Sequence, residues 1–229
     1  MRRGAVRMRP ISFRRVVDLS LPIGPSTQMF PVYPSPTFTP WTTREVHGFL
    51  AESLFFISQT GTHVDAPFHF EPGGKKIDDM PLDRFVTPGH VFDVRGLRPK
   101  DLIVPDHLRT ARRRLHRKVR PGDAILLWTS WGRKVGTRPY LSGNPGLSGA
   151  GARLLVDWGV GLVGIDTANI DHPDDVKFPA HHALLRAGIP VVENVANLGE
   201  LGAGPFVLVA LPLRLAGATG SPIRLVGLV

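Results

Sequence analysis

Proline and glycine interrupt this chain at short intervals, and their spacing limits the length of every helix and strand. The 229 residues include 22 prolines and 25 glycines, spread between short apolar runs. Proline cannot continue a helix or a central strand, and glycine favours turns. No run approaches the roughly 18 consecutive apolar residues that a membrane-spanning helix needs. We therefore expect one compact domain built from short elements.

The periodicity of the apolar runs predicts strands and helices in alternation. Strands are expected at residues 16–19, 54–64, 91–94, 124–128, 162–165, 189–192, 206–213 and 223–229. Helices are expected at about residues 108–115, 148–158 and 180–187. The proline-rich residues 22–40 predict a long ordered loop or arm. This mixture predicts an α/β protein with a basic N-terminal extension at residues 1–15 and a single domain at residues 16–229.

The formal net charge of +9 raises nucleic acid as a partner, but the positions of the arginines favour another explanation. Arginines are concentrated in residues 1–15 and 109–120. In the second cluster Leu108, Ala111 and Leu115 are at helical spacing with arginines between them, which predicts a surface helix with a solvated basic face. No aromatic residue is interleaved for base stacking. We expect neither a nucleic-acid partner nor a membrane partner.

The chain has no cysteine, which excludes disulfides and thiolate chemistry. Any metal ion must therefore be held by nitrogen and oxygen atoms. The first fifteen residues lack the apolar core of a secretory signal, so we expect a cytoplasmic protein.

A polar strand near residue 60 offers such nitrogen and oxygen atoms. In an extended strand, side chains two residues apart share a face, so Gln59, Gly61, His63 and Asp65 would lie together. A His-x-Asp pair supplies one imidazole nitrogen and one carboxylate, which suits zinc, manganese or iron. A hydrogen-bonded structural pair at the end of a strand explains His63 and Asp65 equally well.

Later residues could complete the same site. Pro67 cannot continue a central strand, so we expect a turn there that brings His69 over the site. His181 shares its helix face with two leucines and should point inward. Glu193 follows an apolar strand at its carboxyl end, where α/β sheets tend to place their sites. A paired structural carboxylate is an equally good interpretation of Glu193.

Residues 59–69 resemble the His-x-Gly-Thr-His-x-Asp-x-Pro-x-His motif of the cyclase family of metal-dependent hydrolases, which includes bacterial kynurenine formamidase and isatin hydrolase. The resemblance extends along most of the chain. Similar segments are residues 17–22, 121–129, 164–171, 181–185, 193–194 and 221–224. The resemblance implies a swivelling β/β/α fold with a mixed sheet, assembled as a homodimer or homotetramer.

The resemblance also implies a metal site with one or two divalent ions, zinc or manganese. The metal-binding positions of the family fall on Gln59, His63, Asp65, His181 and Glu193, and its catalytic histidine falls on His69. Gln59 departs from the pattern, because well-studied members carry histidine there. Three consequences are open: a single occupied metal site, a shift towards manganese, or loss of activity. We favour a working site with altered metal occupancy.

The implied reaction is hydrolysis of a small aryl-formamide or cyclic amide, with N-formylkynurenine as the specific prediction. Hydroxide on the ion would attack the carbonyl, and His69 would act as general base and acid. One alternative is a lactone hydrolase or a polyketide-type cyclase that uses the same site. A second alternative, motivated by Gln59 and the arginine cluster, is a non-catalytic basic binding module.

Other residues have two open interpretations, and no substrate-binding residue is predicted. Asp166 and Asp171 could cap turns, which we favour, or could orient metal-bound histidines. Phe30, Tyr33 and Trp41 could line an aromatic pocket, in this or a neighbouring subunit, or could pack in an interface.

Overall fold

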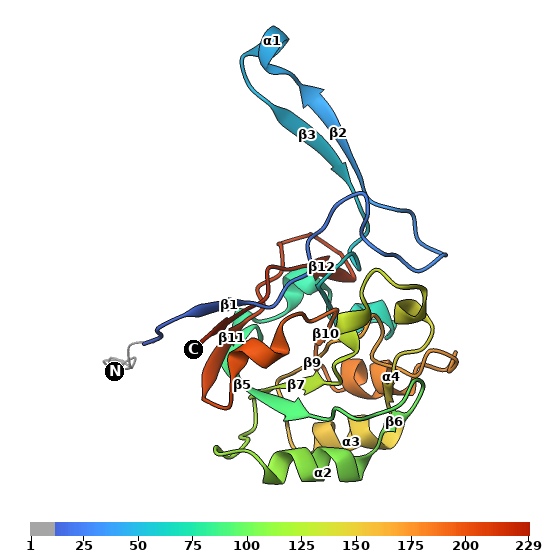
Figure 1. The fold of residues 1–229 in the computed structure, drawn as a ribbon, viewed down its shortest axis with the longest axis vertical. Coiled ribbons are helices and arrows are strands. Elements are labelled where there is room, and N and C mark those ends of the chain that lie inside the picture. The colour runs from blue at the N-terminus through green and yellow to red at the C-terminus, as the bar shows by residue number, and fades with distance from the viewer. Residues whose placement is uncertain (1–11) are drawn as a thin grey trace.

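A nine-stranded mixed sheet forms the centre of the molecule in the computed structural model, which describes residues 12–229 (Figure 1). The strands follow the order β1-β13-β11-β5-β7-β9-β10-β4-β12. Their bounds are β1 Val16–Asp18, β4 His63–Asp65, β5 Val86–Asp93, β7 Ala124–Trp128, β9 Leu162–Ile165, β10 Val191–Glu193, β11 Phe206–Val209, β12 Gly220–Pro222 and β13 Val226–Leu228. The four strands β5, β7, β9 and β10 run parallel, and antiparallel strands continue the sheet on both sides. The α/β class with a mixed sheet is therefore confirmed.

Three helices cover one face of the sheet: α2 Pro105–Arg113, α3 Gly149–Asp157 and α4 Pro179–Arg186 (Figure 1). The two-residue period of a strand sends alternate side chains to opposite faces. Thus Ile125 and Leu127 pack under the helices, whereas Ala124 and Leu126 pack in a second core on the other face. Both sides of β7 are buried, which explains its uninterrupted apolar sequence.

Most elements predicted from the periodicity are confirmed, with shifted ends. The Ser148 side chain accepts a hydrogen bond from the Gly151 N–H (3.0 Å), so the predicted N-cap of α3 is confirmed. Helix α2 ends at Arg113, so Leu115 lies beyond the helix predicted to contain it. Short elements without a clear sequence signal are β6 Leu102–Ile103, β8 Gly146–Leu147, η2 Ile77–Asp79, η3 Leu82–Arg84, η4 Trp131–Lys134, η5 Arg138–Leu141 and η6 Leu198–Leu201. The helical turn η1 (Pro67–His69) forms where Pro67 predicts a turn.

The predicted strand at residues 54–64 is wrong, because the chain contains two separate strands there. Strand β3 (Ala51–Phe55) ends at the start of that range, and β4 begins only at His63. Gly61, in the turn between them, has a φ of +62°, which an extended strand does not allow. The apolar residues at the start of the range therefore belong to a different sheet from the polar residues at its end.

A hairpin arm, defined here as residues 37–55, extends away from the body of the molecule (Figure 1). It consists of β2 (Thr37–Thr42), the one-turn helix α1 (Arg44–His47) and β3. The loop predicted at residues 22–40 is confirmed up to residue 36, after which β2 begins.

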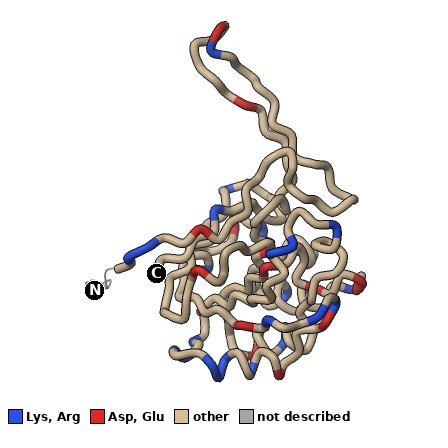
Figure 2. Tube along the Cα trace, in the orientation of Figure 1, with Lys and Arg blue, Asp and Glu red and all other residues tan. Residues whose placement is uncertain are grey.

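The described parts of the basic segments, residues 12–15 and 109–120, lie at the edges of the molecule (Figure 2). Residues 1–11 of the predicted N-terminal extension are outside the described residues. At the end of that extension, the backbone N–H groups of Arg14 and Arg15 donate to the carbonyl of Val229. On α2, Arg112 lies over the ring of Trp158, 4.3 Å from its centroid. Between residues 12 and 229 no helix is both long and apolar enough to cross a membrane.

Candidate metal centre and active site

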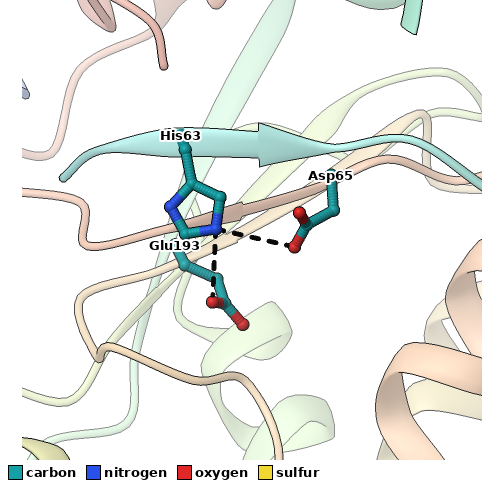
Figure 3. A group of neighbouring side chains, drawn as sticks. All are labelled: His63, Asp65 and Glu193. Carbon is teal, nitrogen blue, oxygen red and sulfur yellow. Dashed lines mark ion pairs between the residues drawn. The ribbon is translucent and has the colours of Figure 1, made fainter. Parts of the chain in front are cut away.

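Strands β4 and β10 bring three metal-ligand side chains to one face of the sheet (Figure 3). The antiparallel register places Glu193 opposite His63, and Asp65 is two residues further along β4 on the same face. The Nε2 atom of His63 lies 3.7 Å from Asp65 Oδ2 and 3.5 Å from Glu193 Oε2. All three side chains are buried, and their ligand atoms lie within 4.8 Å of one another.

Helix α4 adds a second histidine to this group. His181 Nε2 lies 3.7 Å from Asp65 Oδ2 and 3.3 Å from Glu193 Oε1. The predicted inward orientation of His181 is confirmed, since its side chain is buried. The carboxylates of Asp65 and Glu193 thus each lie close to the Nε2 atoms of both His63 and His181.

In His63 and His181, hydrogen bonds to Nδ1 fix the orientation of the ring, so that Nε2 is the atom facing the carboxylates. His63 Nδ1 lies 2.9 Å from the carbonyl oxygen of Gly61, and His181 Nδ1 lies 2.6 Å from Asp171 Oδ2. A carbonyl oxygen can only accept, so Nδ1 of His63 carries the hydrogen. The Nε2 atom of each ring then faces the carboxylates and is free to bind a metal ion, an arrangement typical of metal-bound histidine.

Asp171 performs both of the functions considered for it. Its Oδ1 accepts the backbone N–H of Ala180, and its Oδ2 accepts the backbone N–H and the Nδ1–H of His181. The favoured capping role is therefore confirmed, and the same carboxylate also orients the histidine. Asp166 instead accepts the backbone N–H and the hydroxyl of Thr129, which stabilises the turn after β7.

The Asp65 carboxylate indicates that this group fits a divalent cation. Its Oδ2 atom is buried and has no hydrogen-bond partner among the described residues, a costly state for a charged oxygen. The imidazole nitrogens 3.7 Å away are too distant for hydrogen bonds. Two ligand atoms that each lie about 2.0–2.1 Å from one tetrahedral ion are about 3.3–3.4 Å apart. The observed separations of 3.3–3.7 Å are close to this value.

Burial and opposite charges compete in setting the pKa values of this group. Burial lowers the pKa of His63, but the carboxylates of Asp65 and Glu193 outweigh it and raise that pKa to about 9. For His181, the hydrogen bond to Asp171 and the nearby carboxylates of Asp65 and Glu193 likewise outweigh burial and hold the pKa well above its usual value. Burial raises the pKa of Asp65, but the neighbouring histidines outweigh it and hold that pKa below its usual range. The site thus stabilises positive charge next to its carboxylates, which a bound cation would supply in place of protons.

Gln59 contacts Asp65 through its amide group. Its Nε2 donates to Asp65 Oδ1 (3.3 Å) and to Thr219 Oγ1 (3.1 Å), and its Oε1 accepts from Ser58 (2.7 Å). A Cβ at Gly220 would lie 2.9 Å from Gln59 Nε2, so glycine at that position leaves room for the amide. The metal-ligand role that the resemblance implies for Gln59 stays a prediction.

His69 lies beside this group of candidate ligands but has a different electrostatic environment. The turn predicted at Pro67 is confirmed as the helical turn η1, which places His69 Nε2 3.8 Å from Asp65 Oδ1. Burial lowers the pKa of His69 and outweighs the opposing effect of Asp65. The imidazole is therefore mainly neutral near pH 7, as a general base requires.

A cavity of about 420 Å³ is lined by the His69 ring and by His63, His181 and Glu193. Its aromatic wall consists of Phe30, Tyr33, Phe70 and Phe178. The predicted pocket positions of Phe30 and Tyr33 are confirmed, whereas Trp41 lies on the hairpin arm with 76% of its surface exposed. Among the described residues no lysine or arginine lines this cavity.

Several cavity residues were not singled out from the sequence. Phe70 stacks on His181, with ring centroids 4.4 Å apart and planes at 20°, and Phe178 packs against Phe70. The only available signal for Phe70 was its position directly after His69, the last residue of the motif. Asn194 directly follows Glu193 and has a left-handed φ of 57°, a conformation that asparagine adopts more readily than most residues.

Comparisons with known proteins agree with this geometry. The model of the Cyclase family, described as "Putative cyclase", matches residues 17–172. A kynurenine formamidase of Bacillus thuringiensis (strain Al Hakam) is 33% identical over 213 residues, which cover 92% of this chain and 95% of that protein. An isatin hydrolase structure bound to the product analogue thioisatinate superposes with a TM-score of 0.85 at 25% identity, covering 93% of this chain and 92% of the other. A structure described as a potential metal-dependent hydrolase with cyclase activity has a TM-score of 0.76 at 27% identity, covering 93% of this chain and 96% of the other.

Proposed function

This chain belongs to the cyclase family and is a metal-dependent amidohydrolase, and we propose that it cleaves a small aryl-formamide or cyclic amide with His69 as general base and acid. The observation that carries the proposal is the buried Asp65 Oδ2, which has no hydrogen-bond partner among residues 12–229. It lies 3.7 Å from the Nε2 atoms of His63 and His181, whose side chains line an aromatic cavity. A kynurenine formamidase and an isatin hydrolase among the similar proteins support this substrate class.

The proposed mechanism assigns separate tasks to the two groups of side chains. His63, Asp65, His181 and Glu193 would hold a divalent ion, zinc or manganese. When bound, such an ion lowers the pKa of water and polarises a carbonyl group. Neutral His69 takes a proton from the attacking water and returns it to the leaving nitrogen.

The cavity wall determines which substrates can bind. Burial raises the pKa of Tyr33, and the charges of Asp65 and Glu193 raise it further, so its hydroxyl stays protonated and can donate to a substrate oxygen. The rings of Phe30 and Phe178 offer apolar contact to an aryl group. We therefore propose an aryl ring next to the scissile amide as the common element of the substrates.

A substrate panel tests this function directly. We expect protein loaded with Zn²⁺ or Mn²⁺ to hydrolyse N-formylkynurenine, formanilide or isatin well above the rate in buffer, as measured by product absorbance. An aryl lactone in the same panel tests the lactone hydrolase alternative. Hydrolysis of the lactone alone would replace the amide proposal, and no hydrolysis of any compound by metal-loaded protein would contradict the hydrolase assignment.

We further propose that the site binds a single ion. The Nε2 of Gln59 carries hydrogens towards Asp65 Oδ1 and has no lone pair for a metal, and its Oε1 accepts from Ser58. An imidazole at this position would instead offer a nitrogen ligand beside the same carboxylate. Glutamine in place of histidine at position 59 therefore removes a ligand next to Asp65 Oδ1. The proposed ligands His63 and His181, which face Oδ2, are unaffected.

Gln59→His should raise the metal content from one to two ions per chain, because histidine restores a ligand next to Asp65 Oδ1. Metal content is measured by elemental analysis after dialysis against Zn²⁺. Gln59→Ala is the matched control and should retain one ion. Two ions in the unmodified protein, or one ion in Gln59→His, would contradict the single-ion proposal.

We propose that the chain forms a homo-oligomer and that the hairpin arm contacts the neighbouring subunit. The arm exposes large apolar side chains, namely Phe38, Trp41, Val46, Phe49, Leu50, Leu54 and Phe55. An isolated two-stranded hairpin is marginally stable in water, and a large exposed apolar patch marks an interaction site. A second copy of this chain would bury the arm and account for its composition.

Replacing residues 38–54 with an Asn-Gly turn should convert the dimer, or a tetramer of such dimers, into monomers. Thr37 and Phe55 are paired across the two strands, so a tight turn can join them. Light scattering coupled to size-exclusion chromatography measures the mass. Val176→Glu, at an exposed apolar residue outside the arm, should leave the mass unchanged. A monomeric unmodified protein would contradict this assembly.

A further inference from the structure

Asn194 connects the ends of several strands around the ligand group. Its backbone N–H donates to the carbonyl of Thr167 beyond β9 (2.8 Å). Its own carbonyl accepts from the hydroxyl of Thr62, the residue before His63 (2.7 Å). The residue after Glu193 is therefore attached to the residue before His63.

The Asn194 side chain continues this connection to the His63 ring. Its Nδ2 donates to the carbonyl of Gly61 (2.9 Å), the same oxygen that accepts the Nδ1–H of His63 (2.9 Å). A carbonyl oxygen has two lone pairs, so it can accept both hydrogens. Because that oxygen can only accept, the amide must direct Nδ2 to Gly61 and Oδ1 away from it.

Tyr140, in η5, holds the other end of this amide. Its hydroxyl donates to Asn194 Oδ1 (2.7 Å), and its ring is buried with only 2% exposed. Burial raises the pKa of Tyr140, so the hydroxyl keeps the proton that it donates. The Nε1–H of Trp131 donates to the backbone carbonyl of Tyr140 (3.1 Å), which fixes the position of the turn.

We propose that Asn194 and Tyr140 are positioning residues that hold His63 with Nε2 directed at the metal through the chain Tyr140–Asn194–Gly61. The inference rests on the proposed function, because it concerns a ligand of the proposed metal site. Rotation of the Asn194 amide would break its bonds to Tyr140 and Gly61 together. The carbonyl that orients His63 would then lose one of its two fixed neighbours.

Tyr140→Phe tests the proposal, because it removes one hydroxyl and keeps the ring in its pocket. Loss of an outer hydrogen-bond partner of a metal ligand typically weakens metal binding by about 10- to 100-fold. Tyr140 acts on His63 through Asn194 and the Gly61 carbonyl, so we expect the Kd for Zn²⁺, measured by competition with a chromophoric chelator, to rise towards the lower end of that range. The melting temperature of the metal-free protein provides a separate measure of folding.

Thr137→Val is the matched control, because it removes a hydroxyl from the same loop whose bond goes to the carbonyl of Lys134 and not to Asn194. Its Kd for Zn²⁺ should equal that of the unmodified protein. An unchanged Kd in Tyr140→Phe, with or without a lower melting temperature, would overturn the proposal. If Tyr140→Phe does not fold, Asn194→Asp decides, since it places an acceptor opposite the Gly61 carbonyl and should weaken binding at least as much. Failure of the unmodified protein to bind Zn²⁺ would count against the proposed function instead.

Discussion

Chelation of the divalent ion should reduce amide hydrolysis to the rate in buffer, and Asp65→Asn should cause the same loss permanently. His63 and His181 both face Asp65, and its Oδ2 has no hydrogen-bond partner among residues 12–229. Asparagine has nearly the same shape but lacks the charge that balances a cation. Removal of one charged member from a buried group of this kind leaves the others uncompensated.

Three measurements separate metal loss from unfolding in this experiment. Elemental analysis gives the metal content, product absorbance gives the rate, and circular dichroism reports folding. Zn²⁺ or Mn²⁺ should restore the chelated protein but not Asp65→Asn. Asp123→Asn is the matched control, because Asp123 is also buried and pairs with a histidine, His90, at 2.8 Å. It should keep its metal, and turnover by metal-free protein would refute the metal-dependent mechanism.

The sequence predicted the parts of the site that depend on local periodicity. His63 and Asp65 are two residues apart on one strand, and their shared face follows from strand geometry alone. Pro67 predicted the turn that carries His69 to the cavity. The apolar run before Glu193 predicted β10, whose end positions that carboxylate.

The sequence could not predict the parts that depend on contacts between distant segments. The apolar residues before Gln59 have the composition of a core strand, but they belong to the exposed hairpin arm. Nothing near Tyr140 in the sequence indicates that its hydroxyl reaches Asn194, 54 residues later. The sequence predicted that Asp171 would either cap a turn or orient a histidine. In the structure it does both, because the N–H groups of the first turn of α4 and the His181 ring donate to the same carboxylate.

His69→Ala should lower kcat by about 10²- to 10⁴-fold, the usual contribution of a positioned acid or base. The metal content should not change, because His69 Nε2 faces Asp65 Oδ1, whereas His63 and His181 face the Oδ2 atom of that carboxylate. His116→Ala, at an exposed histidine, is the control and should retain full activity. An unchanged kcat in His69→Ala would exclude the proposed acid and base role.

The pH dependence gives a second test of the same residue. A general base must be unprotonated, and burial lowers the pKa of His69 below its usual value of 6.5. As pH rises, kcat/KM should therefore increase through a midpoint below 6.5 and be level near pH 7, because the neutral form already predominates there. His69→Ala should lack this increase at rates corrected for metal content. A midpoint well above 6.5 would instead require a base other than the buried imidazole, since desolvation can only favour its neutral form.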